Sequence, residues 1–219
     1  MPVWDRLEIT GASGPIANTF LRQDGARLAV VLPGIRGGWM TPAVYYPVLG
    51  ILDEGFDVVC LDSIYRETPG PETLRDDATA AVRAAMAAGG YGQILLAGKS
   101  LGTLAMAEMI LTDPGFAVPA TIWLTPLLRN GRVAAALERL DTPGLIVTGS
   151  EDPHHDSEAL SKLEARAHRV LVLGGAHHGL AVGGDATRSA EIPRQLVAAV
   201  LDYLRQQCAL TTTEGDPDG

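Results

Sequence analysis

Short runs of β-branched and other apolar residues alternate along this chain with longer stretches whose apolar residues have helical spacing. Each run is closed by turn residues, as is typical of strands that are buried on both faces of a parallel sheet. The runs cover residues 27–33, 57–62, 93–98, 120–125, 144–149 and 169–174. This alternation predicts the α/β class, with a mostly parallel sheet and helices on both of its faces.

The stretches between the strands have apolar residues three and four positions apart, which predicts helices. They are expected at residues 42–54, 72–88, 101–111, 132–140, 157–167 and 191–207. Near the N-terminus, residues 3–10 and 15–23 alternate apolar and polar around the glycine-containing turn 11–14. This pattern predicts an antiparallel hairpin at one edge, so that eight strands are expected in total.

A chain of 219 residues is long enough to bury one sizeable core, and one domain over residues 1–210 is expected. Residues 211–219 read TTTEGDPDG and contain no apolar residue. Such a composition cannot offset the entropy lost on folding, so a disordered C-terminal tail is predicted.

The formal net charge of -9 argues against a nucleic-acid surface, because a polyanion would be repelled. The sequence contains no run typical of a signal peptide or a bilayer span, so a cytoplasmic protein without membrane partners is expected. The two cysteines, Cys60 and Cys208, are too few for a disulfide framework and are expected to be separate thiols. Small uncharged or apolar ligands fit this composition best.

One motif points to chemistry. Gly98-Lys99-Ser100-Leu101-Gly102 follows a predicted buried strand directly and opens an apolar helix. A G-x-S-x-G turn between a strand and a helix is the setting of a nucleophile elbow, in which a sharp turn exposes the serine hydroxyl. The pattern by itself is weak, because a serine that caps a glycine-rich turn would look the same.

A serine hydroxyl becomes a good nucleophile only when a base takes its proton and a third group orients that base. The fifth apolar run leads into Glu151 and Asp152, and either carboxylate is a candidate for the orienting group. The sixth run leads into His177 and His178, and either imidazole is a candidate base for Ser100. The chain order serine, acid, histidine is the order that an elbow of this type requires.

With these three segments the chain resembles the α/β-hydrolase superfamily over nearly its whole length. DTPGLIVTGSED is similar to the family's Thr-Pro, apolar strand, Gly-x-x-Asp pattern, which implies Asp152 rather than Glu151 as the acid. GGAHHGL resembles the Gly-Ala-Asp-His pattern of small hydrolases, which implies His178 as the base, with His177 in the preceding slot. PGIRGG, YYP and LLAGKSLGT resemble the small lidless hydrolases near the dienelactone-hydrolase and acyl-peptidase-like branch.

The resemblance also implies an oxyanion hole made of two backbone N–H groups, those of Leu101 and Ile35. Pro33 replaces the histidine that the family usually has before this loop, but a backbone donor survives that change if the loop keeps its shape. No cofactor and no metal is implied. His154 and His155 form a pair, yet no carboxylate or cysteine set at ligand spacing accompanies them.

Several other residues are open to two interpretations. Trp39, Tyr45 and Leu127 follow strand ends and are expected to line the substrate site, although each could equally belong to the core. Lys99 could attract an anion together with Arg36 and Arg66, but solvated or paired surface cations are the stronger expectation. His168 is expected to be a favourable charge at the end of a helix.

The interval between the fourth and fifth apolar runs holds one short helical pattern and leaves no room for a lid. We therefore expect an open, shallow site and a serine hydrolase, carboxylesterase-like, that cleaves small carboxylic esters or thioesters through an acyl-enzyme. A peptidase on small peptides and an α/β-hydrolase-fold binding protein remain alternatives. A small-molecule ester or acyl substrate is the expected partner, and a monomer or homodimer is the expected state.

Overall fold

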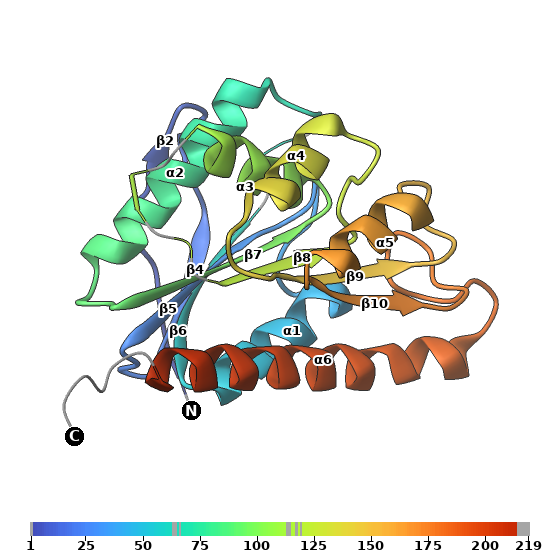
Figure 1. Ribbon diagram of the computed structural model, residues 1–219. Coiled ribbons are helices and arrows are strands. Elements are labelled where there is room, and N and C mark those ends of the chain that lie inside the picture. Colours follow the sequence, from blue (N-terminus) through green and yellow to red (C-terminus); the bar gives the residue numbers. More distant parts are fainter. Residues whose placement is uncertain are drawn as a thin grey trace.

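The computed structural model describes residues 2–62, 65, 67–112, 115–116, 118 and 120–213, with side chains as far as residue 207. An eight-stranded sheet with the order β1-β4-β6-β5-β7-β8-β9-β10 forms its centre (Figure 1). The pairs β1–β4 and β4–β6 are antiparallel and all other neighbours are parallel, which confirms the predicted sheet. The strands are β1 (Val3–Asp5), β4 (Asn18–Arg22), β5 (Arg27–Leu32), β6 (Phe56–Leu61), β7 (Gln93–Lys99), β8 (Ala120–Leu124), β9 (Leu145–Gly149) and β10 (Arg169–Leu173).

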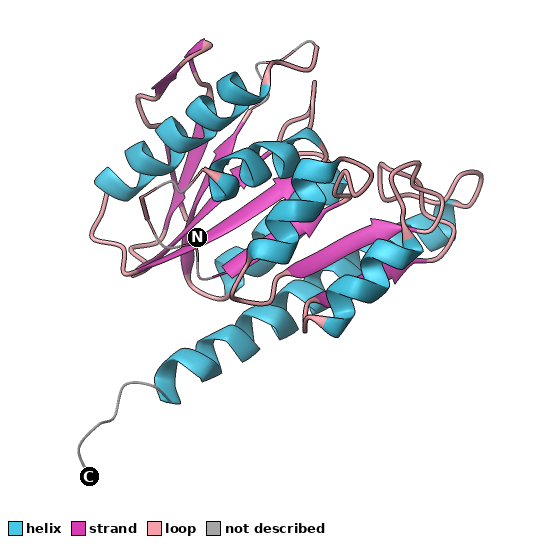
Figure 2. Cartoon of the chain, turned by 45° about the horizontal axis from the view of Figure 1, so that its top comes forward, coloured by secondary structure: helices cyan, strands magenta, loops and turns pink. Residues whose placement is uncertain are grey.

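Helices cover both faces of the sheet, as predicted (Figures 1 and 2). One face carries α1 (Pro42–Asp53) and α6 (Ala186–Thr213), which lie side by side. The other face carries α2, α3, α4 and α5 in a row. Their bounds are α2 (Pro71–Ala87), α3 (Leu101–Leu111), α4 (Gly131–Arg139) and α5 (Ser157–Ala165).

The two hydrophobic cores follow from the period-2 alternation of the strands. In β5, Leu28, Val30 and Leu32 face α2 and α3, whereas Ala29 and Val31 face α1 and α6. Apolar residues on both faces make such a strand a continuous hydrophobic run, which is the feature that revealed it in the sequence.

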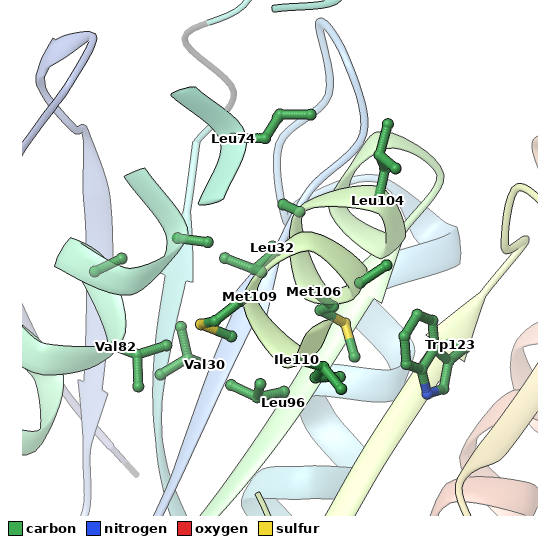
Figure 3. Packing of buried hydrophobic residues seen from close by; sticks show 14 of the residues in the cluster. Val30, Leu32, Leu74, Val82, Leu96, Leu104, Met106, Met109, Ile110 and Trp123 are labelled. Carbon is green, nitrogen blue, oxygen red and sulfur yellow. The ribbon is translucent and has the colours of Figure 1, made fainter. Parts of the chain in front are cut away.

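Helix α3 is the most deeply placed helix of its layer. Every residue from Leu101 to Ile110 is buried. Figure 3 shows Met106 and Met109 of this helix packed among side chains of neighbouring strands and helices. A helix with apolar residues on nearly all sides is stable only when it is buried on all sides. Packing therefore fixes the position of α3, which begins at Leu101, the residue after Ser100.

The predicted N-terminal hairpin is only partly correct. β1 pairs with β4 at the sheet edge, but the turn region forms a separate ladder of β2 (Thr10–Gly11) with β3 (Gly14–Pro15). Between the two ladders, the Asn18 side chain exchanges hydrogen bonds with both the N–H and the carbonyl oxygen of Leu7. These side-chain bonds replace the ladder bonds that a continuous hairpin would have made.

The last helix is longer than the sequence predicted, because α6 begins at Ala186 rather than at residue 191. The Asp185 side chain accepts a hydrogen bond from the N–H of Arg188 at 2.9 Å and thereby caps the N-terminus of α6. At its other end α6 includes Thr211, Thr212 and Thr213, which were expected in the tail. The remaining tail residues and the Cys208 side chain lie outside the described part, whereas Cys60 is a buried free thiol.

His168 is not the surface charge that the sequence suggested. It is buried, its Nδ1 accepts the N–H of Gly144 at 2.9 Å, and its Nε2 lies 3.1 Å from the Leu137 carbonyl oxygen. Burial lowers the pKa of His168 below its ordinary value of 6.5. A neutral imidazole therefore joins α4 to β9.

In the described part of the chain, no helix combines the length and apolar character that a bilayer span needs.

This arrangement predicts how His168 affects stability. His168→Leu leaves the Gly144 N–H and the Leu137 carbonyl without partners, and should lower the free energy of unfolding by about 1–3 kcal/mol at pH 7.5. The pKa of the native histidine lies below that of the unfolded chain, so the unfolded state binds more protons and wild type loses stability as pH falls below 6.5. Urea unfolding should therefore show a smaller difference between the two proteins at pH 5.5. A difference that grows on acidification would contradict a neutral buried imidazole.

Candidate active site

The residues with predicted chemical roles follow parallel strands whose carboxyl ends meet at one edge of the sheet. Ser100 follows β7, Asp152 lies in the turn after β9, and His178 lies in the loop after β10. The loop of residues 33–38 follows β5, the neighbour of β7. Ligand sites in open α/β sheets lie outside the carboxyl ends of the strands, and the topology thus brings these segments to such an edge.

Ser100 lies in a strained turn. Its φ of 52° and ψ of -113° fall in a region that residues with a side chain rarely adopt. A Cβ on Gly98 would lie 2.4 Å from the Met106 sulfur, and a Cβ on Gly102 would lie 2.0 Å from the Leu32 carbonyl oxygen. The strand and the helix approach closely enough that only glycine fits on either side of Ser100.

The structure brings the three predicted side chains together in a chain of hydrogen bonds. The Oγ atom of Ser100 lies 2.7 Å from Nε2 of His178. On the other side of the ring, Nδ1 of His178 lies 2.7 Å from Oδ2 of Asp152. Because an ionised carboxylate can only accept hydrogen bonds, Nδ1 of His178 carries a proton and donates a hydrogen bond to Asp152. This tautomer leaves Nε2 free to accept a hydrogen bond from the serine hydroxyl.

Asp152 has the environment of a permanently ionised acid. Its side chain has 0% exposure, and its other oxygen, Oδ1, accepts the N–H of His154 at 2.8 Å. Burial would raise the pKa of Asp152, but the hydrogen bonds from His178 and from the His154 N–H outweigh it and lower the pKa below the ordinary 3.8. The sequence did not reveal the His154 N–H as a donor to Asp152. The signal available was an aspartate in a turn, whose side chain often accepts the N–H two residues further on.

The neighbouring candidates do not reach this chain of hydrogen bonds. Glu151 is exposed, and its backbone N–H donates to the Ala176 carbonyl. His177 is exposed too, and its Nδ1 accepts the N–H of Gly179 within its own loop. The geometry therefore favours Asp152 and His178, as the family resemblance implied.

The loop after β5 and the first residue of α3 both lie beside Ser100. A Cβ on Gly34 would lie 3.3 Å from the Ser100 Cβ, so the loop after β5 approaches the serine closely. Among the described residues, the N–H groups of Ile35 and Leu101 have no protein acceptor. Leu101 is the first residue of α3, where a helix leaves its N–H groups unpaired and carries partial positive charge.

Lys99 differs from the solvated cation expected at this position. It is half-buried, and its ammonium donates to Oγ1 of Thr125 at 3.3 Å and to the carbonyl oxygen of His178 at 3.2 Å. Burial lowers the pKa of Lys99, while the negative charge of Asp152 acts in the opposite direction. Lys99 thus connects the end of β7 to the end of β8 and to the loop that carries His178. Arg66, considered with it, lies outside the described residues.

A pocket of about 550 Å³ opens beside Ser100 and His178, between α1 and α6. Its walls are mainly apolar, and its polar members are Thr41, Lys99, Ser100, His178 and Ser189. The open site that was expected from the short interval between the fourth and fifth apolar runs includes this pocket.

The side chains predicted to bind substrate do not line this pocket. Trp39 is buried, donates its indole N–H to Thr19 at 3.3 Å, and stacks on Tyr45 with ring centroids 6.0 Å apart. Leu127 is half-buried and packs against the core around α3. Trp39 is thus buried and Tyr45 and Leu127 are half-buried against apolar neighbours, and a role in substrate binding stays a prediction for all three.

The histidine pair after Asp152 also has a defined position. The ring centroid of His154 lies 5.5 Å from that of His178. Within the described residues, no group of three or more His, Cys, Asp or Glu side chains is arranged to bind a metal ion.

The tight elbow yields a stability prediction. Gly102→Ala should lower the free energy of unfolding by about 1–3 kcal/mol or more, because the new methyl group meets the Leu32 carbonyl, which the backbone cannot easily move. The matched control is Gly131→Ala at the start of α4, where a Cβ meets nothing within 4 Å and stability should change by about 0.5 kcal/mol at most. Equal unfolding midpoints for the two variants would contradict the close approach.

No protein-family model and no curated protein matches the chain. Solved structures do match. An α/β serine hydrolase without lid from Xanthomonas campestris has a TM-score of 0.71 at 15% identity, covering 93% of this chain and 94% of that one. An esterase from Pyrococcus furiosus has a TM-score of 0.71 at 14% identity, over 94% and 91% of the two chains. Est1E from Butyrivibrio proteoclasticus, with ferulic acid bound, has 0.72 at 13%, over 94% and 99%. The chain therefore has the α/β-hydrolase fold, in the form without a lid.

Proposed function

We propose that this protein is a serine hydrolase that cleaves small carboxylic esters, or thioesters, through an acyl-enzyme intermediate. The observation that carries the proposal is the continuous chain of two 2.7 Å hydrogen bonds from Ser100 through His178 to Asp152, at a strained elbow. The proposal is supported by the shared fold with an esterase from Pyrococcus furiosus.

The first half of the reaction assigns a role to each side chain. The Oγ atom of Ser100 attacks the ester carbonyl carbon as Nε2 of His178 takes the hydroxyl proton. Asp152 accepts the Nδ1 proton in a hydrogen bond and stabilises the imidazolium that forms. When the tetrahedral intermediate collapses, the C–O bond of the ester breaks and His178 returns the proton to the departing alcohol.

The second half releases the acid. Water attacks the acyl-serine while His178 takes one of its protons, and collapse of the second tetrahedral intermediate returns that proton to Oγ of Ser100. In both halves the N–H groups of Leu101 and Ile35, which have no acceptor among the described residues, donate to the negatively charged oxygen of the former carbonyl group. Each of these steps uses only residues of the chain and water.

The direct test is covalent labelling of Ser100. A fluorophosphonate should add once to wild type, giving one adduct by intact mass, and the adduct should be absent in Ser100→Ala. The same substitution should lower kcat/KM for p-nitrophenyl acetate by about 10⁴-fold, because the nucleophile itself is lost. Circular dichroism would show that the variant is folded. Turnover near the wild-type level in a folded Ser100→Ala protein would refute the assignment.

The choice of acid has its own test. Asp152→Asn should lower kcat by about 10²–10⁴-fold, because an amide can favour the wrong imidazole tautomer and cannot stabilise the imidazolium. The neighbour provides a matched control. Glu151 is exposed and makes no side-chain contact with His178, so Glu151→Gln should leave kcat within about twofold. A larger loss from Glu151→Gln than from Asp152→Asn would show that the acid is misassigned.

A further inference from the structure

The pocket beside Ser100 has a size and a position that make it part of the substrate site. Its volume of about 550 Å³ falls within the range of small-molecule sites in proteins. Ser100 and His178 belong to its lining, together with Gly34 and Ile35 of the proposed oxyanion loop. A group attached to the reacting carbonyl could therefore occupy the pocket while the carbonyl carbon stays beside Ser100.

The walls away from Ser100 come from the two helices that cover this face of the sheet. Helix α1 contributes Ala43 and Val44, and α6 contributes Ile192 and Leu196, all of them buried. Leu180, from the loop after His178, is buried as well. These walls gain most from a ligand made of methylene groups, because such a ligand leaves water for an apolar surface without leaving any polar group unpaired.

The polar groups of the pocket are already engaged by the protein. The Ser189 hydroxyl has the Asp185 carbonyl oxygen at 2.8 Å and the Val182 carbonyl oxygen at 3.1 Å as acceptors for its one proton, and it accepts the Val182 N–H. The Lys99 ammonium donates to Thr125 and to the His178 carbonyl. None of the described lining residues is a carboxylate. Among the described lining residues the apolar side chains therefore outnumber the polar ones, and Lys99 and Ser189 already bond to protein oxygens.

From these observations we infer that the pocket between α1 and α6 binds the acyl part of the substrate, and that this part is an apolar chain longer than acetyl. The inference rests on the proposed function, which makes Ser100 the nucleophile. The acyl group stays covalently attached while water attacks it, whereas the alcohol must diffuse away, so a pocket with buried walls suits the acyl part. Helices α1 and α6 supply the walls that a lid supplies in larger enzymes.

The first experiment uses wild type and a series of p-nitrophenyl esters from acetate through butyrate, hexanoate and octanoate to palmitate, each below its micelle concentration. The leaving group is constant, so differences report the acyl part. We expect kcat/KM to rise by about threefold for each added methylene up to octanoate, and then to level off or fall. An optimum at acetate with a steady decline would overturn the inference. A series of alkyl acetates that shows the same rise would overturn it too, since the pocket would then hold the alcohol.

The second experiment fills the pocket. Ala43→Leu should lower the octanoate-to-acetate ratio of kcat/KM at least tenfold, because the longer side chain occupies space that a long acyl chain needs. The matched control is Ala134→Leu, which lines a different hollow between α4 and α5 and should keep the wild-type ratio. Equal ratios in both variants would contradict the location, and the wild-type series tests the inference even if Ala43→Leu fails to fold.

A third comparison tests the role assigned to Lys99. The p-nitrophenyl monoester of adipic acid has a six-carbon acyl chain that ends in a carboxylate, and should be cleaved at least tenfold more slowly than the hexanoate ester. Faster cleavage of the adipate ester would mean that Lys99 recognises an anion and that the apolar inference is wrong. Fluorophosphonate labelling separates the two proposals. A labelled Ser100 without chain-length preference refutes only the acyl pocket, whereas no adduct and no turnover refute the proposed function and the pocket with it.

Discussion

The close approach of α3 to the strands β5 and β7 is the contact on which the arrangement of the site depends. Gly98 and Gly102 leave no room for a Cβ, and the buried residues of α3 fix the helix in that position. Ser100 must therefore adopt its positive φ, because a relaxed backbone would draw the helix away from the sheet. The free energy gained by burying α3 offsets the cost of the strained backbone at Ser100. This backbone conformation places the serine hydroxyl next to the histidine.

The electrostatics of the site follow from what is buried and what is hydrogen-bonded. Asp152 keeps its charge in a buried position because His178 and the His154 N–H both donate to it. The half-buried Lys99 ammonium lies on the same edge of the sheet and donates to the His178 carbonyl. The acid therefore holds the ring of His178, and the lysine holds its backbone, so that the imidazole is constrained from two sides.

The face of the sheet that carries α1 and α6 gives this small fold a pocket without a separate lid. Residues 125–144, all of which are described, hold α4 alone, so no lid domain stands between β8 and β9. The apolar walls come instead from helices that the fold needs anyway to cover the sheet. Their side chains serve the core and the proposed acyl site together, which is why the pocket has no separate signature in the sequence.

The sequence by itself determined the class of fold and the order of its elements, because apolar runs and helical spacing located the strands and helices within a few residues. The family resemblance implied Ser100, Asp152 and His178, whose catalytic roles remain predictions. Only the tertiary structure decided which side chains share a cavity. The sequence left open whether Trp39, Tyr45 and Leu127 line the site or the core. The structure buries Trp39, leaves the other two half-buried against the core, and places none of the three in the lining of the pocket beside Ser100. Periodicity shows on which face of its own helix or strand a residue lies. A pocket, or a buried neutral imidazole such as His168, is formed by elements that are distant in the chain.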